Sequence, residues 1–146
     1  MFDSLLTYLD KLANIDDNAI WFEVIDRETQ FEIIRLNTED QLFDDGIDSL
    51  DRKIGEYSPL SVSIKTSKGQ RTDHITLKDT GEFYQSFRVK VDKWGMFIAA
   101  DDVKDDTVLT ERYGIDILGL TEENTQVLIN MIRQKYIKEL HERLSY

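Results

Sequence analysis

The stretch "TLKDTGEFYQSF", Thr76–Phe87, holds the sharpest change of pattern in the chain. An extended apolar segment is followed by a polar corner, a single glycine and a segment rich in aromatic residues. We expect Leu77 to end an extended segment. Asp79 or Thr80 then caps a short helix, and Gly81 allows the tight turn between the two. The helix would turn three aromatic side chains toward a sheet: Phe83, Tyr84 and Phe87.

The segments on either side of this corner predict strands. "LSVSIKT", residues 60–66, alternates apolar and polar residues, which is typical of a half-buried strand. A polar loop, "SKGQRTDH", separates it from the extended segment that ends at Leu77. On the other side, "RVKVDKWGMFIAAD", residues 88–101, alternates on both sides of "DKWG" and predicts a β-hairpin. Together these segments predict a small antiparallel sheet with a short inserted helix.

Helical spacing dominates the two ends of the chain. Apolar residues within 2–12 recur at intervals of three or four, as on one face of a helix. Residues 19–36 mostly keep this spacing, and we favour a helix there, although their β-branched and aromatic content also allows a pair of strands. "LNTEDQLFDDGID" predicts a continuing or second helix that ends at Gly46. From Thr121, its expected N-cap, a long amphipathic helix reaches about residue 144.

This order of elements predicts an α+β fold in a single domain, residues 1–146. Its parts are N-terminal helices, a small antiparallel sheet with a short inserted helix, and the long C-terminal helix. The segment 101–119 is expected to be partly irregular surface loop. The chain is 40% hydrophobic, which is enough for one core of ordinary size.

The charge of the chain is strongly acidic and unevenly placed. The net charge is −11, and residues 1–50 hold 13 acids and 3 bases, whereas residues 51–92 hold 6 acids and 8 bases. This asymmetry suits solubility, and it equally suits an acidic face of one subunit meeting a basic face of the next. Phosphate binding by the whole chain is disfavoured because it needs clustered Lys and Arg.

Other sequence features bear on the class of protein. The chain has no cysteine, which excludes disulfides, thiolate metal sites and a cysteine nucleophile. No apolar run approaches the roughly 20 residues of a membrane span. The first residues carry acids where a secretory signal carries Lys or Arg. We therefore expect a soluble, non-secreted protein with no membrane partner.

The sequence patterns that could indicate a catalytic or metal-binding site are weak. His74 and His141 are the only histidines, and neither has a second histidine at ligand spacing. The acids of "ADDVKDDT", residues 100–107, could hold a hard cation but lack the glycine and glutamate of a calcium loop. "DTGE" matches three residues of the aspartic proteases outside their strand–loop setting. We expect no enzyme, no catalytic or metal site and no cofactor; a small cytoplasmic metal-dependent enzyme and a monomeric binding module are the alternatives.

The order of features within residues 43–91, about a third of the chain, resembles the phage virion-morphogenesis and tail-completion proteins. The nearest likeness is to uncharacterised proteins of phages and prophages of Bacteroides-like bacteria. The shared pattern is two glycines, an aromatic residue, Ser/Pro-Leu-Ser/Thr, a lysine-rich loop, and then Leu-x-x-Thr-Gly followed by aromatic and serine positions. The matching positions are Gly46, Gly55, Tyr57, Pro59, Leu60, Ser61, Lys65, Leu77, Thr80, Gly81, Phe83, Ser86 and Phe87. Many relatives have tryptophan where this chain has Tyr57.

The resemblance implies a non-enzymatic structural protein of the phage neck or tail end, with a family-like core at about residues 43–100. It implies a ring at the head–tail junction, built from copies of this chain and contacting connector and tail proteins. The chain would be assembled in the host bacterial cytoplasm and reside in the virion, with DNA passing only through the lumen. As the basic side of a contact between copies we expect Lys65, Lys68 and Arg71, on a loop between two strands.

Overall fold

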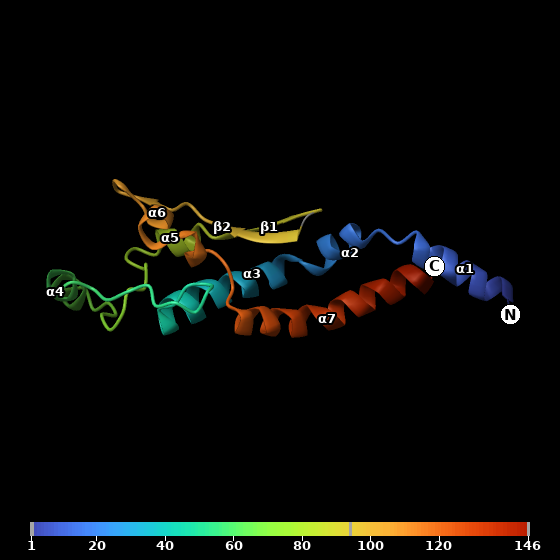
Figure 1. Ribbon diagram of the computed structural model, residues 1–146, viewed down its shortest axis with the longest axis horizontal. Coiled ribbons are helices and arrows are strands. Elements are labelled where there is room, and N and C mark those ends of the chain that lie inside the picture. Colours follow the sequence, from blue (N-terminus) through green and yellow to red (C-terminus); the bar gives the residue numbers. More distant parts are fainter. Residues whose placement is uncertain (1, 94, 146) are drawn as a thin grey trace.

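The computed structural model describes residues 2–93 and 95–145, and it shows an elongated α+β molecule (Figure 1). This confirms the fold class expected from the sequence. Helices fill both ends of the chain, a two-stranded hairpin lies in the middle, and the C-terminal helix is the longest element. For Phe2 and Asp3 the description covers the backbone only.

The N-terminal third forms consecutive helices: α1 (Phe2–Ala13), α2 (Asp17–Val24), α3 (Arg27–Arg35) and the π-helix η1 (Leu36–Asp45). Local caps set the helix starts, because the Asp16 carboxylate accepts from the amide of Ala19 at 3.2 Å and the Asp26 carboxylate accepts from that of Thr29 at 2.9 Å. At the other end, Gly46 stops η1 in the left-handed conformation, with φ 63°. The helical interpretation of residues 2–12 and the stop at Gly46 are confirmed, and residues 19–36 are helical except for a break at Ile25 and Asp26 between α2 and α3.

The strand expected at residues 60–66 is wrong, because these residues lie within helix α4 (Pro59–Ser67). The Ser58 hydroxyl accepts from the amide of Ser61 at 3.2 Å, and Pro59 occupies the first helical position, where its missing N–H costs nothing. Leu60 and Ile64 are four residues apart, so they share a helix face as readily as a strand face. The start signal at Ser58–Pro59 therefore overrides the alternation that follows it.

The hairpin expected after the aromatic segment is confirmed. The short helix α5 (Glu82–Gln85) leads into β1 (Arg88–Asp92), which pairs antiparallel with β2 (Gly95–Ala99) in the register Arg88↔Ala99. Of the expected "DKWG" turn, Trp94 lies outside the described residues. The Asp92 carboxylate accepts from the amide of Gly95 at 3.1 Å across the turn.

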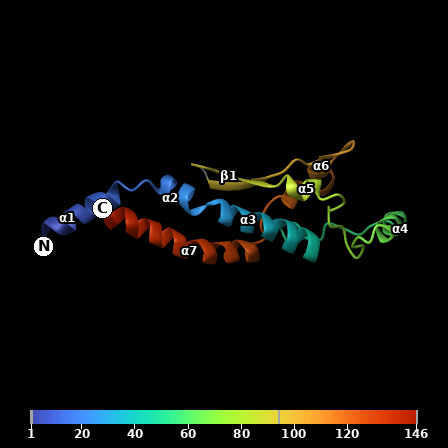
Figure 2. The ribbon, with the colours of Figure 1, turned by 180° about the vertical axis from the view of Figure 1, so that it is seen from behind.

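Residues 101–119, expected to be partly irregular, contain short elements. A second antiparallel pair joins β3 (Val103–Lys104) and β4 (Thr107–Val108). The helix α6 (Leu109–Tyr113) and the 3-10 turn η2 (Ile115–Ile117) follow. This region forms the outer edge of the molecule beside α5 (Figure 2).

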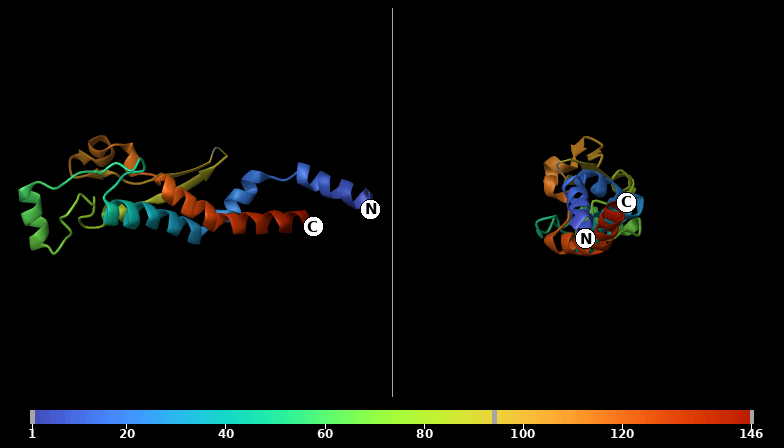
Figure 3. Two further views of the ribbon diagram at one scale, coloured as in Figure 1. Left: turned by 60° about the horizontal axis from the view of Figure 1, so that its bottom comes forward. Right: turned by 90° about the vertical axis from the view of Figure 1, so that its right-hand side faces the viewer.

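The C-terminal helix α7 (Glu122–Ser145) matches the helix expected from Thr121 to about residue 144. The Thr121 hydroxyl accepts from the amide of Asn124 at 3.1 Å, as an N-cap does. In Figure 1 the hairpin lies on one side of α3 and α7 on the other. The left view of Figure 3 shows α1 projecting past the end of α7.

Two clusters of buried apolar side chains fill the layers. The first joins α2, α3 and α7 beneath the hairpin: Ile20, Val24, Ile25, Ile33, Leu128 and Ile132. The second lies under α5 and α6: Leu42, Phe83, Tyr84, Phe87, Leu109 and Ile117. Ile98 of β2 packs against both, so the hairpin joins the two clusters.

Two fully buried amides of η1 hold the segment that leads into α7. The Asn37 side chain donates to the carbonyl of Ile117 at 3.0 Å and accepts from the amide of Gly119 at 2.8 Å. Gln41 donates to the Gly119 carbonyl at 2.8 Å, and its carbonyl oxygen accepts from the Thr121 amide at 2.9 Å. We call Asn37 and Gln41 the amide clamp. It satisfies backbone groups that would otherwise be buried without partners.

Candidate interaction surfaces

Thr76, whose side chain is buried, is bonded by two tyrosines, of which Tyr57 belongs to the motif that carries the family resemblance. The hydroxyl of Tyr57 lies 3.2 Å from the Thr76 hydroxyl and accepts from the Thr76 amide at 3.0 Å. The Tyr84 hydroxyl donates to the Thr76 carbonyl, and burial raises the pKa of Tyr84 above its ordinary value. Two tyrosines from separate segments therefore fix the corner that the sequence placed before the short helix.

The corner itself differs from its expected form at Leu77. This residue has φ 58° and lies in a turn, so it does not end a strand. Gly81 has φ 91° and is the N-cap of α5, as the tight turn required. The Thr80 hydroxyl accepts from the amide of Glu82 at 3.3 Å, so it supports the helix start from one position earlier than the cap.

The remaining motif positions are also structural. Phe83 and Phe87 pack edge-to-face with ring centroids 5.0 Å apart, and the Ser86 hydroxyl accepts from the amide of Asp101 at 2.9 Å. Pro59 begins α4, and at Gly55 a Cβ would lie 3.3 Å from the side chain of Ile75. The motif thus builds the scaffold around α5, and the surfaces that could contact partners lie elsewhere.

Gly46 is held by a residue that the sequence left without a role. A Cβ at Gly46 would lie 2.4 Å from the ring of His74, so only glycine allows this ring to pack against the backbone. Nε2 of His74 lies 2.7 Å from the carbonyl oxygen of Phe43. His74 is therefore part of the scaffold that joins η1 to the segment before α5.

The three basic residues expected at an interface do not lie on a loop between strands. Lys65 belongs to α4, Lys68 is the C-cap of that helix, and Arg71 lies in the loop after it. All three bond within the chain. Lys65 donates to the Lys78 carbonyl at 3.1 Å, and Lys68 pairs with Asp79 at 3.3 Å.

Arg71 is neutralised more completely than the two lysines. Its guanidinium pairs with Asp73 and Asp44 and donates to the Phe43 carbonyl at 3.1 Å. The hydrogen bond from Arg71 lowers the pKa of Asp73 to about 2. Arg71 therefore serves the scaffold beside His74, which weakens the expectation that it binds a partner.

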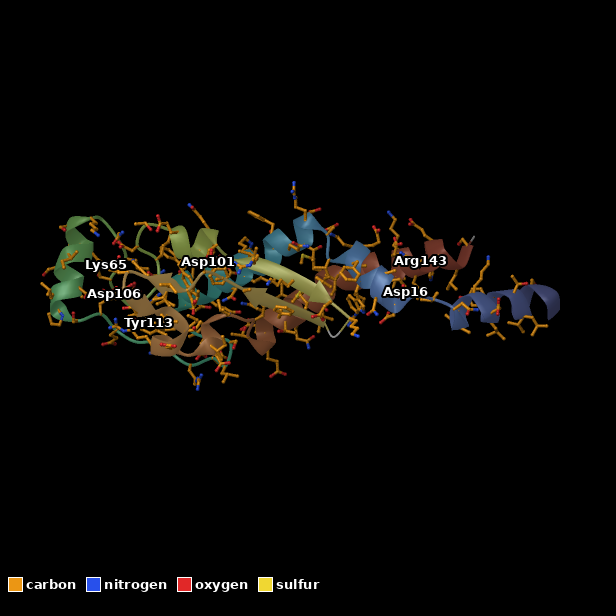
Figure 4. All side chains as sticks on the ribbon, turned by 90° about the horizontal axis from the view of Figure 1, so that it is seen from above. Asp16, Lys65, Asp101, Asp106, Tyr113 and Arg143 are labelled. Atoms are coloured by element: carbon orange, nitrogen blue, oxygen red, sulfur yellow. The ribbon has the colours of Figure 1, made fainter. Side chains whose placement is uncertain are left out.

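Lys65 and Lys68 do contribute to a concave surface. A cavity of about 310 Å³ lies between α4, α6 and the β3–β4 pair, and we call it the α4–α6 cavity. Figure 4 shows Lys65, Asp106 and Tyr113 grouped at this end of the molecule, away from Asp16 and Arg143. Lys68 and Lys104 from opposite sides both bond Asp79, and hydrogen bonds from Lys104 and Gln70 hold the pKa of Asp79 well below its ordinary value.

The acids of residues 101–106 do not converge. Asp101 pairs with Arg88 at 3.2 Å, and the Asp102 carboxylate accepts from the hydroxyl of Thr110. Asp105 and Asp106 are exposed in the turn between β3 and β4. Within residues 2–93 and 95–145, no group of three histidine, aspartate or glutamate side chains could hold a metal ion.

Among the described residues, the largest group of exposed apolar side chains on one element lies on α1. Four leucines of this helix are between 46% and 62% exposed, together with Tyr8: Leu5, Leu6, Leu9 and Leu12. The helix meets the body mainly at its end, where the Lys11 ammonium donates to the Leu144 carbonyl at 3.5 Å. The sequence indicated the helix and its apolar face, but helical spacing alone also describes a helix packed in a core.

The α4–α6 cavity was missed by sequence reasoning because its cations come from separate segments. Lys78, Lys104 and Arg112 join Lys65 and Lys68 only after α4 and α6 are placed. No spacing pattern in the chain links these positions.

No protein-family model, curated protein or solved structure matches the chain.

Proposed function

We propose that this chain is a structural subunit of the phage neck or tail end that joins copies of itself into a ring at the head–tail junction. It has no catalytic role in this proposal and resides in the virion. The resemblance within residues 43–91 supports the class of protein. The observation that carries the assembly is the exposed apolar face of α1.

In the single chain, the apolar face of α1 is exposed to solvent. A helix of 12 residues is marginal in water unless its apolar face is packed. Four half-exposed leucines face solvent in the single chain, and covering the rest of each contributes about 1 kcal/mol. A gain of about 4 kcal/mol for one helix favours packing of α1 against another protein surface.

A protein surface suits α1 better than a lipid surface. Helices that lie on membranes are rich in Lys and Arg on their polar face, whereas "FDSLLTYLDKLA" has two aspartates and one lysine. In the part of the chain that the structure describes, no helix combines the length and apolarity needed to cross a membrane. We therefore assign α1 to contacts with further copies or with connector and tail proteins, and DNA to passage through the lumen.

The test is the mass of the purified chain in solution. We expect the wild type to form oligomers at concentrations on the order of 100 μM, and Leu6→Ser with Leu9→Ser to leave a folded monomer. The matched control is Leu50→Ser, since Leu50 is 59% exposed but lies in the loop before α4. Light scattering after size-exclusion chromatography measures the mass. A monomeric wild type, or a serine variant that assembles normally, contradicts the proposal.

The phage role needs its own experiment. Antibody against the chain, applied to purified particles of the phage that encodes it, should label one end of the tail or the neck in electron micrographs. Particles with no label and no copy of the chain by mass spectrometry would overturn the virion assignment. An oligomer that never enters particles would leave an assembly protein of another class.

A further inference from the structure

The α4–α6 cavity has a charge opposite to that of the chain. Five cationic side chains line it, against the carboxylates of Asp79 and Asp105: Lys65, Lys68, Lys78, Lys104 and Arg112. This leaves an excess of three positive charges in one cavity of a protein whose net charge is −11. Such a local reversal of sign marks a place where an anionic group is attracted.

Three of these cations have no carboxylate partner among the described residues. The Asp79 carboxylate forms ion pairs with Lys68 at 3.3 Å and with Lys104 at 2.9 Å. The remaining three face neutral groups: Lys65 lies 4.8 Å from the Tyr57 ring centroid, Lys78 is 5.0 Å from that of Phe43, and Arg112 is 5.3 Å from that of Tyr113. The cavity therefore offers positive charge beside aromatic and aliphatic walls. Its best ligand is a carboxylate next to an apolar side chain.

The exposed side chains of α2 and α3, which we call the α2–α3 face, include such groups. Glu23 and Glu28 are exposed, and neither forms an ion pair within the described residues. On the same two helices, Phe22 and Phe31 are 55% and 67% exposed. Arg27 is the one opposing charge between the two glutamates in sequence. In Figure 1, α2 lies far from α4 with α3 between them, so the side chains of α2 do not reach the cavity of their own chain.

We propose that the α4–α6 cavity binds the α2–α3 face of a second copy of this chain. Glu23 and Glu28 of one copy meet Lys65, Lys78 and Arg112 of the next, and Phe31 packs against the apolar wall. This contact rests on the proposed function and assigns it a second surface besides α1. Because cavity and ligand face differ, the contact is head-to-tail, which is the type that closes into a ring. The charges set its register and its rate of encounter.

A charge swap tests the contact directly. Arg112→Glu and Glu28→Arg should each weaken self-association about 10-fold, because each places like charges opposite one another. The two changes in one chain, or an equal mixture of the two single variants, should return the association to within about 3-fold of the wild type. Arg112 and Glu28 are both exposed, so the folded monomer is expected to survive each change.

The control is Lys138→Glu, an exposed lysine of α7 in no ion pair of the described residues, which should leave association unchanged. Sedimentation measures the dissociation constants, and the circular dichroism melt checks the fold. Single variants that associate like the wild type, or a pair that fails to recover, overturn the contact. Loss of binding to a short DNA duplex in Arg112→Glu, with normal self-association, would show a phosphate site and also overturn it.

The two proposals fail in different ways. A wild type that stays monomeric overturns the proposed function together with this contact. A wild type that assembles through α1, but is indifferent to the charge reversals, overturns only the role of the cavity.

Discussion

The two ends of this elongated molecule differ in the side chains that they expose. At the α4 end, charged side chains bond one another, as Lys68 and Lys104 do around Asp79, and helix α4 buries no residue. At the α1 end, four leucines face solvent, and the Lys11 ammonium donates to the Leu144 carbonyl of α7 at 3.5 Å. The middle, between the ends, holds both apolar clusters and the amide clamp. Stability therefore resides in the middle, and the ends are available for contacts.

The largest effect that this comparison predicts is at the amide clamp. Asn37→Ala should lower the free energy of unfolding by about 2–4 kcal/mol, because it leaves the buried Ile117 carbonyl and the half-buried Gly119 amide without their partner. Asn130→Ala, on the exposed face of α7, is the matched control and should change it by less than about 0.5 kcal/mol. Urea unfolding measures both. Equal effects would show that the clamp does not hold the middle together.

The next largest effect on stability is expected at the glycines of the motif, and the two should differ. Gly46→Ala should destabilise the fold by about 2–3 kcal/mol, since the methyl group meets the His74 ring at 2.4 Å in a left-handed backbone. Gly81→Ala should cost only about 1 kcal/mol, because at φ 91° the nearest atom lies 3.7 Å away on the flexible Gln85. Thermal unfolding ranks them. The reverse order would show that the α5 corner, and not the packing of His74, is the tighter part of the scaffold.

The smallest expected effect on stability is at the α4 end, where Asp79 pairs with two lysines. The pKa of Asp79 is depressed in the folded chain by the hydrogen bonds from Lys104 and Gln70, so its contribution is present above the unfolded value of 3.8. That contribution is lost as the pH falls through the folded pKa. The wild type should therefore lose more thermal stability than Asp79→Asn when the pH is lowered from 5 to about 2.5. Equal losses of melting temperature in the two proteins over this pH range would show that the ion pairs at this end contribute nothing to folding.

Local signals were enough to predict most of the helices and the hairpin. Asp16, Asp26 and Thr121 each accept from the amide three residues ahead, and a cap of this kind needs no distant partner. The alternation of residues 88–101 identified the hairpin for the same reason. Gly46 and Gly81 were recognised as turn positions, because their positive φ angles are local backbone properties.

The errors arose where two local signals competed or where distant segments met. Residues 60–66 alternate like a strand, yet the cap at Ser58 and the proline after it made them helix α4. As a result Lys65, Lys68 and Arg71, expected together on a loop, were placed on different structures with different partners. Leu77 fits an extended segment by composition, but the tyrosines bonded to Thr76 hold it in a turn.

The sequence by itself determined the class of the fold, the end of η1 at Gly46, the start of α7 after Thr121 and the acidic balance of the N-terminal third. Those properties depend on residues within a few positions of one another, or on composition. The tertiary structure alone decided the amide clamp, the packing of His74 on Gly46 and the α4–α6 cavity. Each joins residues far apart in the chain, as Asn37 and Gly119 are, and no local spacing encodes a contact that forms only when distant segments pack.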